Sequence, residues 1–286
     1  MKRILVLAVI VAAGPCVHAV TTLDAANRFA YGANIGWVDG YADGANGAVV
    51  GEYVCSGYLY GANIGWINLG NGNPTNGIYY QNLSAEDFGV NQDGAGNLRG
   101  YAWGANIGWI RFEELGAPKV DLRTGNLSGH IYSANCGWLS LTNGFAQMQT
   151  ERIAPGSREA SGLPLAWQLL HFGQTGVSAD ADADGDGVSN LLEYLAGTNP
   201  KDPSSRLIIT SHAFTAEGNS ESVAWQSVPN GFYYLQTSVD LASTAVWSDS
   251  GLGLIASDGI ISARTIPATN GAIRFYRVQA VRPLGP

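Results

Sequence analysis

Charged side chains are scarce in this chain, and basic residues are fewer than acidic residues. They make up 13% of the 286 residues, and 23 acidic against 15 basic residues give a net charge of −8. Binding to nucleic acid needs a basic footprint facing the phosphates, so nucleic acid is excluded as a partner. After the N-terminal segment there is no run of about 18 consecutive apolar residues, so the sequence predicts no transmembrane segment.

Motifs for catalysis are also missing. The sequence has no HExxH zinc motif, no GxSxG nucleophile elbow and no phosphate-binding glycine loop. Its histidines beyond the N-terminal segment are scattered, one to a region. A glycosidase needs two carboxylates that meet in the fold, and the spacing of the acidic residues singles out no pair. We therefore expect that the protein is not an enzyme.

The N-terminal segment has the features of a secretory signal peptide. Lys2 and Arg3 precede an apolar stretch over residues 4–13, and small residues lead up to a cleavage position near Ala19. Acylation at Cys16 would instead make a lipoprotein, although Pro15 directly before it fits that pattern poorly. We expect residues 1–19 to be removed and the protein to be secreted, either extracellular or on the cell surface.

Cysteine is rare, and two of the three cysteines lie beyond the signal peptide, at Cys55 and Cys136. Both stand where related segments of the chain have leucine or isoleucine, which predicts that both are buried. Export permits a disulfide between them. Two buried free thiols are the alternative.

Glycine is abundant, with 38 residues, and it recurs at fixed positions of a fourfold repeat. The copies read "FAYGANIGWVDG", "YLYGANIGWINLG", "YAWGANIGWIRFE" and "IYSANCGWLSLTN". Short apolar runs separated by Gly and Asn predict about three strands in each unit. Because such a unit cannot bury its own apolar face, we expect residues 20–149 to form a β-repeat domain in which the units stack.

Each copy repeats an asparagine, a glycine and a tryptophan. We expect the asparagines to occupy tight turns and the glycines to allow close approach beside the large indole. Packing in the core is the first interpretation of the tryptophans, and stacking on a sugar or another ligand is the alternative. The four are Trp37, Trp66, Trp109 and Trp138.

A change of composition follows the repeats. Residues 150–162 are polar and rich in Gly and Ser, which predicts a linker. Residues 163–205 contain two segments with helical spacing around an acidic loop, and residues 206–286 alternate in short β runs. The expected fold is mainly β, with a helical connector before a β-sandwich of immunoglobulin or fibronectin type.

The acidic loop "DADGDGVSNLLE" carries the most specific chemistry. It places carboxylates at positions 1, 3 and 5, a glycine at position 6 and a glutamate at position 12, the pattern of a twelve-residue calcium loop. Without a cation these charges would repel one another. The expected calcium ligands are Asp182, Asp184, Asp186, Val188 through its carbonyl, Asn190 and Glu193.

The longer segment "DADADGDGVSNLLEYLAGTNPKDPSS" resembles the calcium-binding connectors of secreted bacterial proteins, which are related to thrombospondin type 3 repeats and dockerin-type loops. The GANIGW copies resemble repeats of such proteins. The resemblance implies that calcium stiffens a junction between domains.

Together these features predict a calcium-binding structural or adhesive protein at the cell exterior. Its expected partners are calcium and a polysaccharide or another cell-surface protein. A carbohydrate-binding module that uses the repeat aromatics is the alternative function, and a glycoside hydrolase ranks behind it.

Overall fold

The computed structural model describes residues 21–42, 45–215, 218–242, 244–268 and 274–285. The predicted signal peptide lies outside these residues. The chain divides into two compact units, one running to Val177 and including the last residues from Pro283, and the other spanning Ser178–Arg282. This boundary falls inside the predicted connector 163–205. Helix α1 (Leu165–Phe172) belongs to the first unit, whereas the acidic loop and helix α2 (Asn190–Ala196) belong to the second.

The fold is mainly β, as the sequence predicts. Both helices are short and end at a glycine with a left-handed backbone, Gly173 after α1 and Gly197 after α2. Within the described part of the chain, neither these nor any other helix has the length and apolar character needed to cross a membrane.

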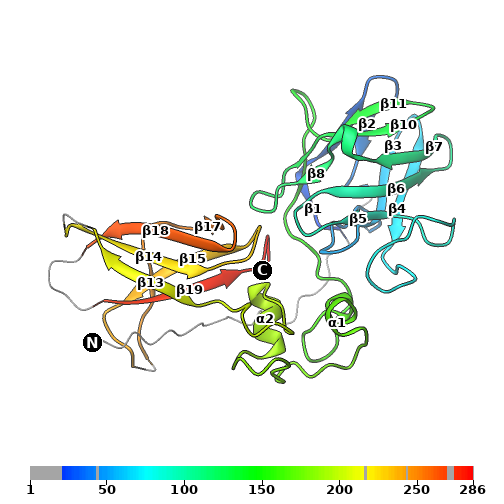
Figure 1. Cartoon of the computed structure of the whole chain (residues 1–286). Helices are drawn as coiled ribbons and strands as arrows, with labels where there is room; N and C mark the ends of the chain where they lie inside the picture. The colour runs from blue at the N-terminus through cyan, green and yellow to red at the C-terminus, as the bar shows by residue number, and fades with distance from the viewer. Residues whose placement is uncertain (1–20, 43–44, 216–217, 243, 269–273, 286) are drawn as a thin grey trace. The chain divides into compact units, whose positions relative to one another are not determined.

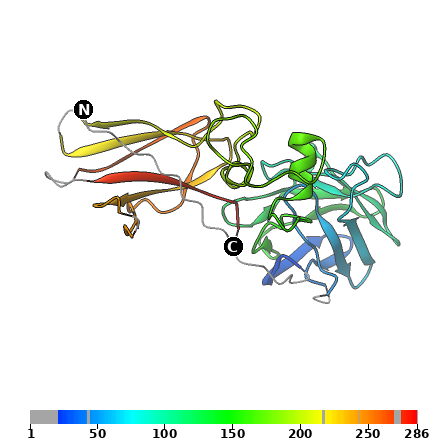
Figure 2. The same cartoon turned by 90° about the horizontal axis from the view of Figure 1, so that it is seen from below.

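The four repeats form four β-hairpins that close into an antiparallel barrel (Figures 1 and 2). Neighbouring hairpins pair edge to edge, and the last strand pairs with the first, so the predicted stack of units closes on itself. Closure leaves no free sheet edge in this ring of strands. Its strands are β1 (Leu23–Gly32), β2 (Gly36–Asp39), β3 (Ser56–Gly61), β4 (Gly65–Asn71), β6 (Leu98–Gly104), β7 (Gly108–Phe112), β10 (His130–Ser133) and β11 (Gly137–Ser140).

Small and branched apolar side chains fill the barrel interior. Each hairpin contributes one from each strand, and all are at most 2% exposed: Ala30, Val38, Leu59, Ile67, Ala102, Ile110, Ile131 and Leu139. Since successive side chains of a strand point to opposite faces, the residues on either side of these positions point outward. An eight-stranded barrel has an interior just wide enough for side chains of this size.

The repeated turns all lie at one end of the barrel, because every hairpin runs in the same direction. Gly36 and its equivalents have positive φ, between 71° and 79°, so only glycine suits this position without strain. Gly32 is required for a different reason, since a Cβ there would lie 2.8 Å from Cγ1 of Ile35. Ile35 and its counterparts Ile64 and Ile107 are buried and cover this end of the barrel.

The fourth repeat differs in two positions that compensate for each other. Ser133 replaces the first glycine, and Cys136 replaces the isoleucine that would crowd it. The smaller cysteine leaves room for the hydroxymethyl group of Ser133, whose Oγ donates to the carbonyl of Ile107 at 3.1 Å.

The two cysteines do not form the expected disulfide. Cys55 and Cys136 are both free and buried, so the alternative interpretation is confirmed. Cys136 lies in a turn, whereas Cys55 precedes β3 and so lies at the other end of the barrel. The six residues of β3 between these ends span roughly 20 Å, far beyond the Cα separation of a disulfide. Burial raises the pKa of the Cys55 thiol to about 12.

Several short elements flank the barrel. They are β5 (Val90–Gln92), which pairs with β6, β12 (Met148–Thr150), which pairs with β1, the paired strands β8 (Lys119–Val120) and β9 (Leu127–Ser128), and the 3-10 turn η1 (Glu114–Gly116). The third and fourth repeats thus have the extra strand that the sequence predicts for every unit.

The second unit contains the predicted β-sandwich. One sheet has the order β13-β14-β18, and β15 is the centre of the other, paired with β16, β17 and β19. Their inward faces form one core that includes Trp225, Tyr233 and Val278. The strands are β13 (Ile209–Phe214), β14 (Ser220–Gln226), β15 (Phe232–Ser238), β16 (Ser248–Asp249), β17 (Ile255–Ala256), β18 (Ile261–Pro267) and β19 (Phe275–Val281).

Candidate functional site: an aromatic belt and an acidic loop

Every hairpin of the barrel carries three aromatic rings on its outer face. The register places Tyr31 of β1 directly opposite Trp37 of β2. Phe29, two residues before Tyr31, points outward from the same face of β1. The other hairpins repeat this arrangement. We call the twelve residues the aromatic belt: Phe29, Tyr31 and Trp37; Tyr58, Tyr60 and Trp66; Tyr101, Trp103 and Trp109; His130, Tyr132 and Trp138.

The rings within a hairpin support one another. In each cluster the tryptophan lies between its two neighbours, with centroid distances from 4.8 to 5.4 Å to the directly opposite ring. The distance to the second ring is 5.8 to 6.3 Å. Steeply inclined contacts at these distances are favourable for aromatic pairs, so the clusters hold their shape without a ligand.

The tryptophans of the belt are not core residues, and the core-packing prediction is wrong. Trp37 is 49% exposed, and Trp66, Trp109 and Trp138 are 41 to 43% exposed. By contrast, Trp167 and Trp225 are at most 3% exposed. The barrel interior is already filled by the residues between the aromatic positions, and an indole from each repeat could not enter it.

A polar side chain separates each cluster from the next. Asp39 lies opposite Tyr60 of the following hairpin, and Asn68 lies opposite Trp103. Arg111 opposite Tyr132 and Ser140 opposite Tyr31 complete the ring. Asp39, Asn68 and Arg111 are partly or fully exposed, whereas Ser140 is buried and its hydroxyl donates to the carbonyl of Thr142 at 2.8 Å.

The repeated asparagines join the hairpins at the turn end. The side-chain amide of Asn63 donates to the carbonyl of Ile35 in the preceding repeat at 3.0 Å. The equivalent bonds from Asn106 and Asn135 measure 3.1 Å, and Asn34 closes the circle by donating to the carbonyl of Cys136 at 3.0 Å. The side chain of each asparagine thus ties its turn to the turn of the neighbouring repeat.

The acidic loop of the second unit brings its aspartates together. Carboxylate oxygens of Asp182, Asp184 and Asp186 lie within 4.8 Å of one another. Asp182 accepts the backbone N–H groups of Gly185 and Gly187 at 2.7 and 2.8 Å. These bonds lower the pKa of Asp182 and keep its carboxylate charged, and the bond from Gly187 has the largest effect. The loop therefore brings together the three carboxylates that the pattern places at positions 1, 3 and 5.

Four buried oxygens of this loop and helix α2 have no hydrogen-bond partner. They are Oδ2 of Asp184, Oδ2 of Asp186, Oδ1 of Asn190 and Oε2 of Glu193. Burial, followed by the charges of the neighbouring aspartates, raises the pKa of Glu193 to about 7. Buried oxygens left unpaired are costly, and a hard cation that takes six to eight oxygen ligands would satisfy them. The side chains present therefore fit calcium.

The remaining predicted ligand is Val188, which donates its backbone N–H to Asp186 at 2.8 Å. Glu193 and Asn190 lie on the first turn of α2, where the loop pattern requires them. On Glu193, Oε1 accepts a hydrogen bond from Thr198 at 3.2 Å, whereas Oε2 is buried without a hydrogen-bond partner.

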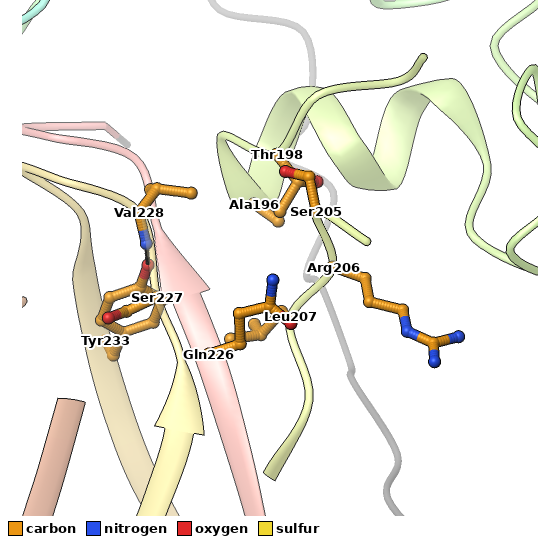
Figure 3. A pocket seen from close by; sticks show the side chains of 9 residues that line it. All are labelled: Ala196, Thr198, Ser205, Arg206, Leu207, Gln226, Ser227, Val228 and Tyr233. Carbon is orange, nitrogen blue, oxygen red and sulfur yellow. Dashed lines mark hydrogen bonds between the residues drawn. The ribbon is translucent and has the colours of Figure 1, made fainter. Parts of the chain in front are cut away.

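Two small pockets add no ligand site. One lies where the end of α2 meets the sandwich, next to Thr198, Gln226 and Tyr233 (Figure 3). The other is the apolar barrel interior around Cys55. Each has a volume of about 20 Å³, enough for little more than one water molecule and far below a small-molecule site.

Comparison of the chain with protein-family models, with curated proteins and with solved structures gives no match.

The sequence analysis did not identify one position of each cluster, the aromatic residue two places before the ring that lies opposite the tryptophan. Phe29, Tyr58, Tyr101 and His130 occupy it. The signal was present, since an aromatic–aliphatic–aromatic alternation such as "YLY" places both rings on one face of a strand.

Proposed function

We propose that this protein binds carbohydrate through the aromatic belt and binds calcium in the acidic loop. The repeated exposure of supported rings carries the proposal. A tryptophan held between two neighbouring rings loses little freedom on binding, so its contact with the C–H face of a sugar has a low entropic cost. Asp39, Asn68 and Arg111, which lie between the clusters and are not buried, supply partners for sugar hydroxyls.

The absence of a ligand-sized cavity among the described pockets favours a polymer as ligand. An exposed sheet surface contacts a few sugar units of a chain at a time, whereas a small molecule needs a concave site to bury most of its area. The net charge of −8 disfavours acidic polysaccharides, because long-range repulsion would slow their approach. A neutral glycan suits the surface best.

Calcium has a separate, structural role in this proposal. Glu193 is followed on α2 by Tyr194, which is 2% exposed and whose ring lies 4.7 Å from the guanidinium of Arg282 at the end of β19. A cation bound by Glu193 would hold the start of α2 and so fix this packing. Calcium would stabilise the second unit, and secretion of the protein would supply the ion at millimolar concentration.

Retention on insoluble polysaccharides tests the binding function. Purified chain is mixed with cellulose, chitin, insoluble xylan and starch granules, and the bound fraction is measured. The variants are Trp37→Ala, Trp66→Ala and the double variant, with Phe145→Ala as a matched control, since Phe145 is an 86% exposed aromatic residue of the same unit outside the belt.

We expect binding to at least one polysaccharide, a several-fold loss in each single variant, a larger loss in the double variant and no change in the control. A cooperative thermal unfolding transition like that of the original chain establishes that the variants fold. Folded tryptophan variants that bind as well as the original chain would refute the proposal, as would a chain that binds none of the four polymers.

A further inference from the structure

The closed order of the strands places the four clusters on different sides of the barrel. Each hairpin forms one quarter of the wall, in the order first, second, third, fourth and back to first. The clusters of Trp37 and Trp109 therefore lie on opposite walls, and those of Trp66 and Trp138 lie on the other two. Surfaces on opposite walls face in opposite directions.

The size of the barrel separates opposite clusters. With a strand spacing of about 4.8 Å and a tilt of about 40°, an eight-stranded barrel is roughly 16 Å across at the backbone. The outward rings add their own length on both sides. A stiff polysaccharide that lies along one cluster cannot reach the opposite one.

The clusters are also separate from one another around the barrel. Among the described residues, the ring contacts between belt members are all made within a hairpin. The residues between them, such as Asp39 and Asn68, are polar. The belt is therefore a set of four discrete surfaces and not one continuous apolar band.

We infer that the protein cross-links glycan chains, with clusters on opposite walls binding different chains. This inference rests on the proposed carbohydrate binding and adds a consequence that binding alone does not have. A protein with one binding face coats a polymer, whereas one with opposed faces joins polymers into a network and gains avidity.

Precipitation of soluble neutral polysaccharides tests the inference. Monomeric chain, verified by light scattering, is titrated into xyloglucan, galactomannan and soluble β-glucan, and turbidity is followed against the protein-to-polymer ratio. Affinity electrophoresis in gels containing the same polymers measures binding independently. We expect turbidity that rises and then falls as protein saturates the chains.

The variants separate cross-linking from binding. Trp37→Ala/Trp109→Ala keeps two opposed clusters and should still precipitate polymer, although at higher protein concentration. Trp37→Ala/Trp66→Ala/Trp109→Ala keeps one cluster and should still be retarded in the gel, with turbidity reduced at least tenfold. Phe145→Ala should behave as the unchanged chain. Should the triple variant unfold, the same double and triple variants with leucine in place of alanine give the same series with less loss of packing.

The outcomes are distinguishable. Binding without turbidity at any ratio, or a soluble one-to-one complex in which a polymer wraps the barrel, overturns cross-linking and leaves the proposed function standing. Turbidity that persists in the triple variant also overturns it. Absence of binding to every polymer in both assays removes the proposed function itself.

Discussion

The calcium loop gives the sharpest prediction, because two measurements on one variant should move in opposite directions. Glu193→Gln keeps the size of the side chain and removes its charge. With calcium present, the change removes the negative charge of a carboxylate that is expected to bind the ion. Without calcium, it removes a buried carboxylate whose pKa is raised to about 7 by burial and by the charges of Asp184 and Asp186.

The size of the calcium effect follows from mass action. Extracellular loops of this type bind calcium with Kd of about 10⁻⁴ to 10⁻³ M. At about 10 mM calcium, binding to the folded state alone adds about 1.4 to 2.7 kcal/mol to the free energy of unfolding. The second unit, Ser178–Arg282, has about 100 residues, for which each kcal/mol raises the melting temperature by about 4–8 °C. We expect a rise of roughly 6–20 °C.

Differential scanning calorimetry provides the assay, because the two compact units should unfold in separable transitions. Calcium should raise the transition of the second unit and leave that of the barrel unmoved, so the barrel serves as an internal reference. In Glu193→Gln, the calcium-dependent rise should fall to less than a quarter, and the melting temperature in chelator should equal or exceed that of the original chain. Asp240→Asn, an exposed carboxylate of the same unit, is the control and should change neither value.

Two results would refute this reasoning. One is the absence of any calcium-dependent shift in the original chain at millimolar calcium. The other is a Glu193→Gln variant that responds to calcium as fully as the original chain, which would show that the four unpaired oxygens do not form the site.

Three further predictions concern the barrel. Asn63→Ala should lower the free energy of unfolding by about 1 kcal/mol, because it removes the hydrogen bond to the preceding repeat. Asn63→Asp should lower it further, because a carboxylate oxygen would then face the carbonyl of Ile35. Equal urea midpoints for the two variants would contradict this. Cys136→Ile should destabilise the barrel by about 1–3 kcal/mol, because the larger side chain would crowd Ser133. Adding Ser133→Gly to this variant should restore stability. Additive effects in the double-mutant cycle would show that the two positions do not interact. Asp87 has a lowered pKa, chiefly through the hydroxyl of Thr75, so its contribution to stability is present above its unfolded pKa of about 3.9 and is lost as the pH falls through the lower folded value. Between about pH 5 and pH 3, the barrel should therefore lose more stability in the original chain than in Asp87→Asn, and identical losses would exclude this role.

Local chemistry made several elements readable from the sequence. Gly173 and Gly197 stop their helices because a left-handed backbone costs glycine little. The spacing of Asp182 to Glu193 defined the acidic loop, because ligand positions in such loops depend on the backbone of consecutive residues. These features need only a few neighbouring residues and no knowledge of the rest of the fold.

The cysteines show where such reasoning stops. The repeats predict that Cys55 and Cys136 are buried, and both are. Whether they meet depends on which end of the barrel each occupies, which follows from the closure of the hairpins and not from the repeat pattern. The strand between the two ends keeps the thiols apart.

The sequence by itself determined that each repeat consists of short β-strands joined by turns of Gly and Asn, and that aliphatic residues such as Ile67 stand next to aromatic residues such as Trp66. It did not determine which kind lies inside, because both faces of the strands are apolar and either could form a core. Only closure of the four hairpins decided this. The interior of an eight-stranded barrel accommodates Ala, Val, Leu and Ile but not a tryptophan from every repeat, so the rings face outward and form the surface on which the proposed function depends.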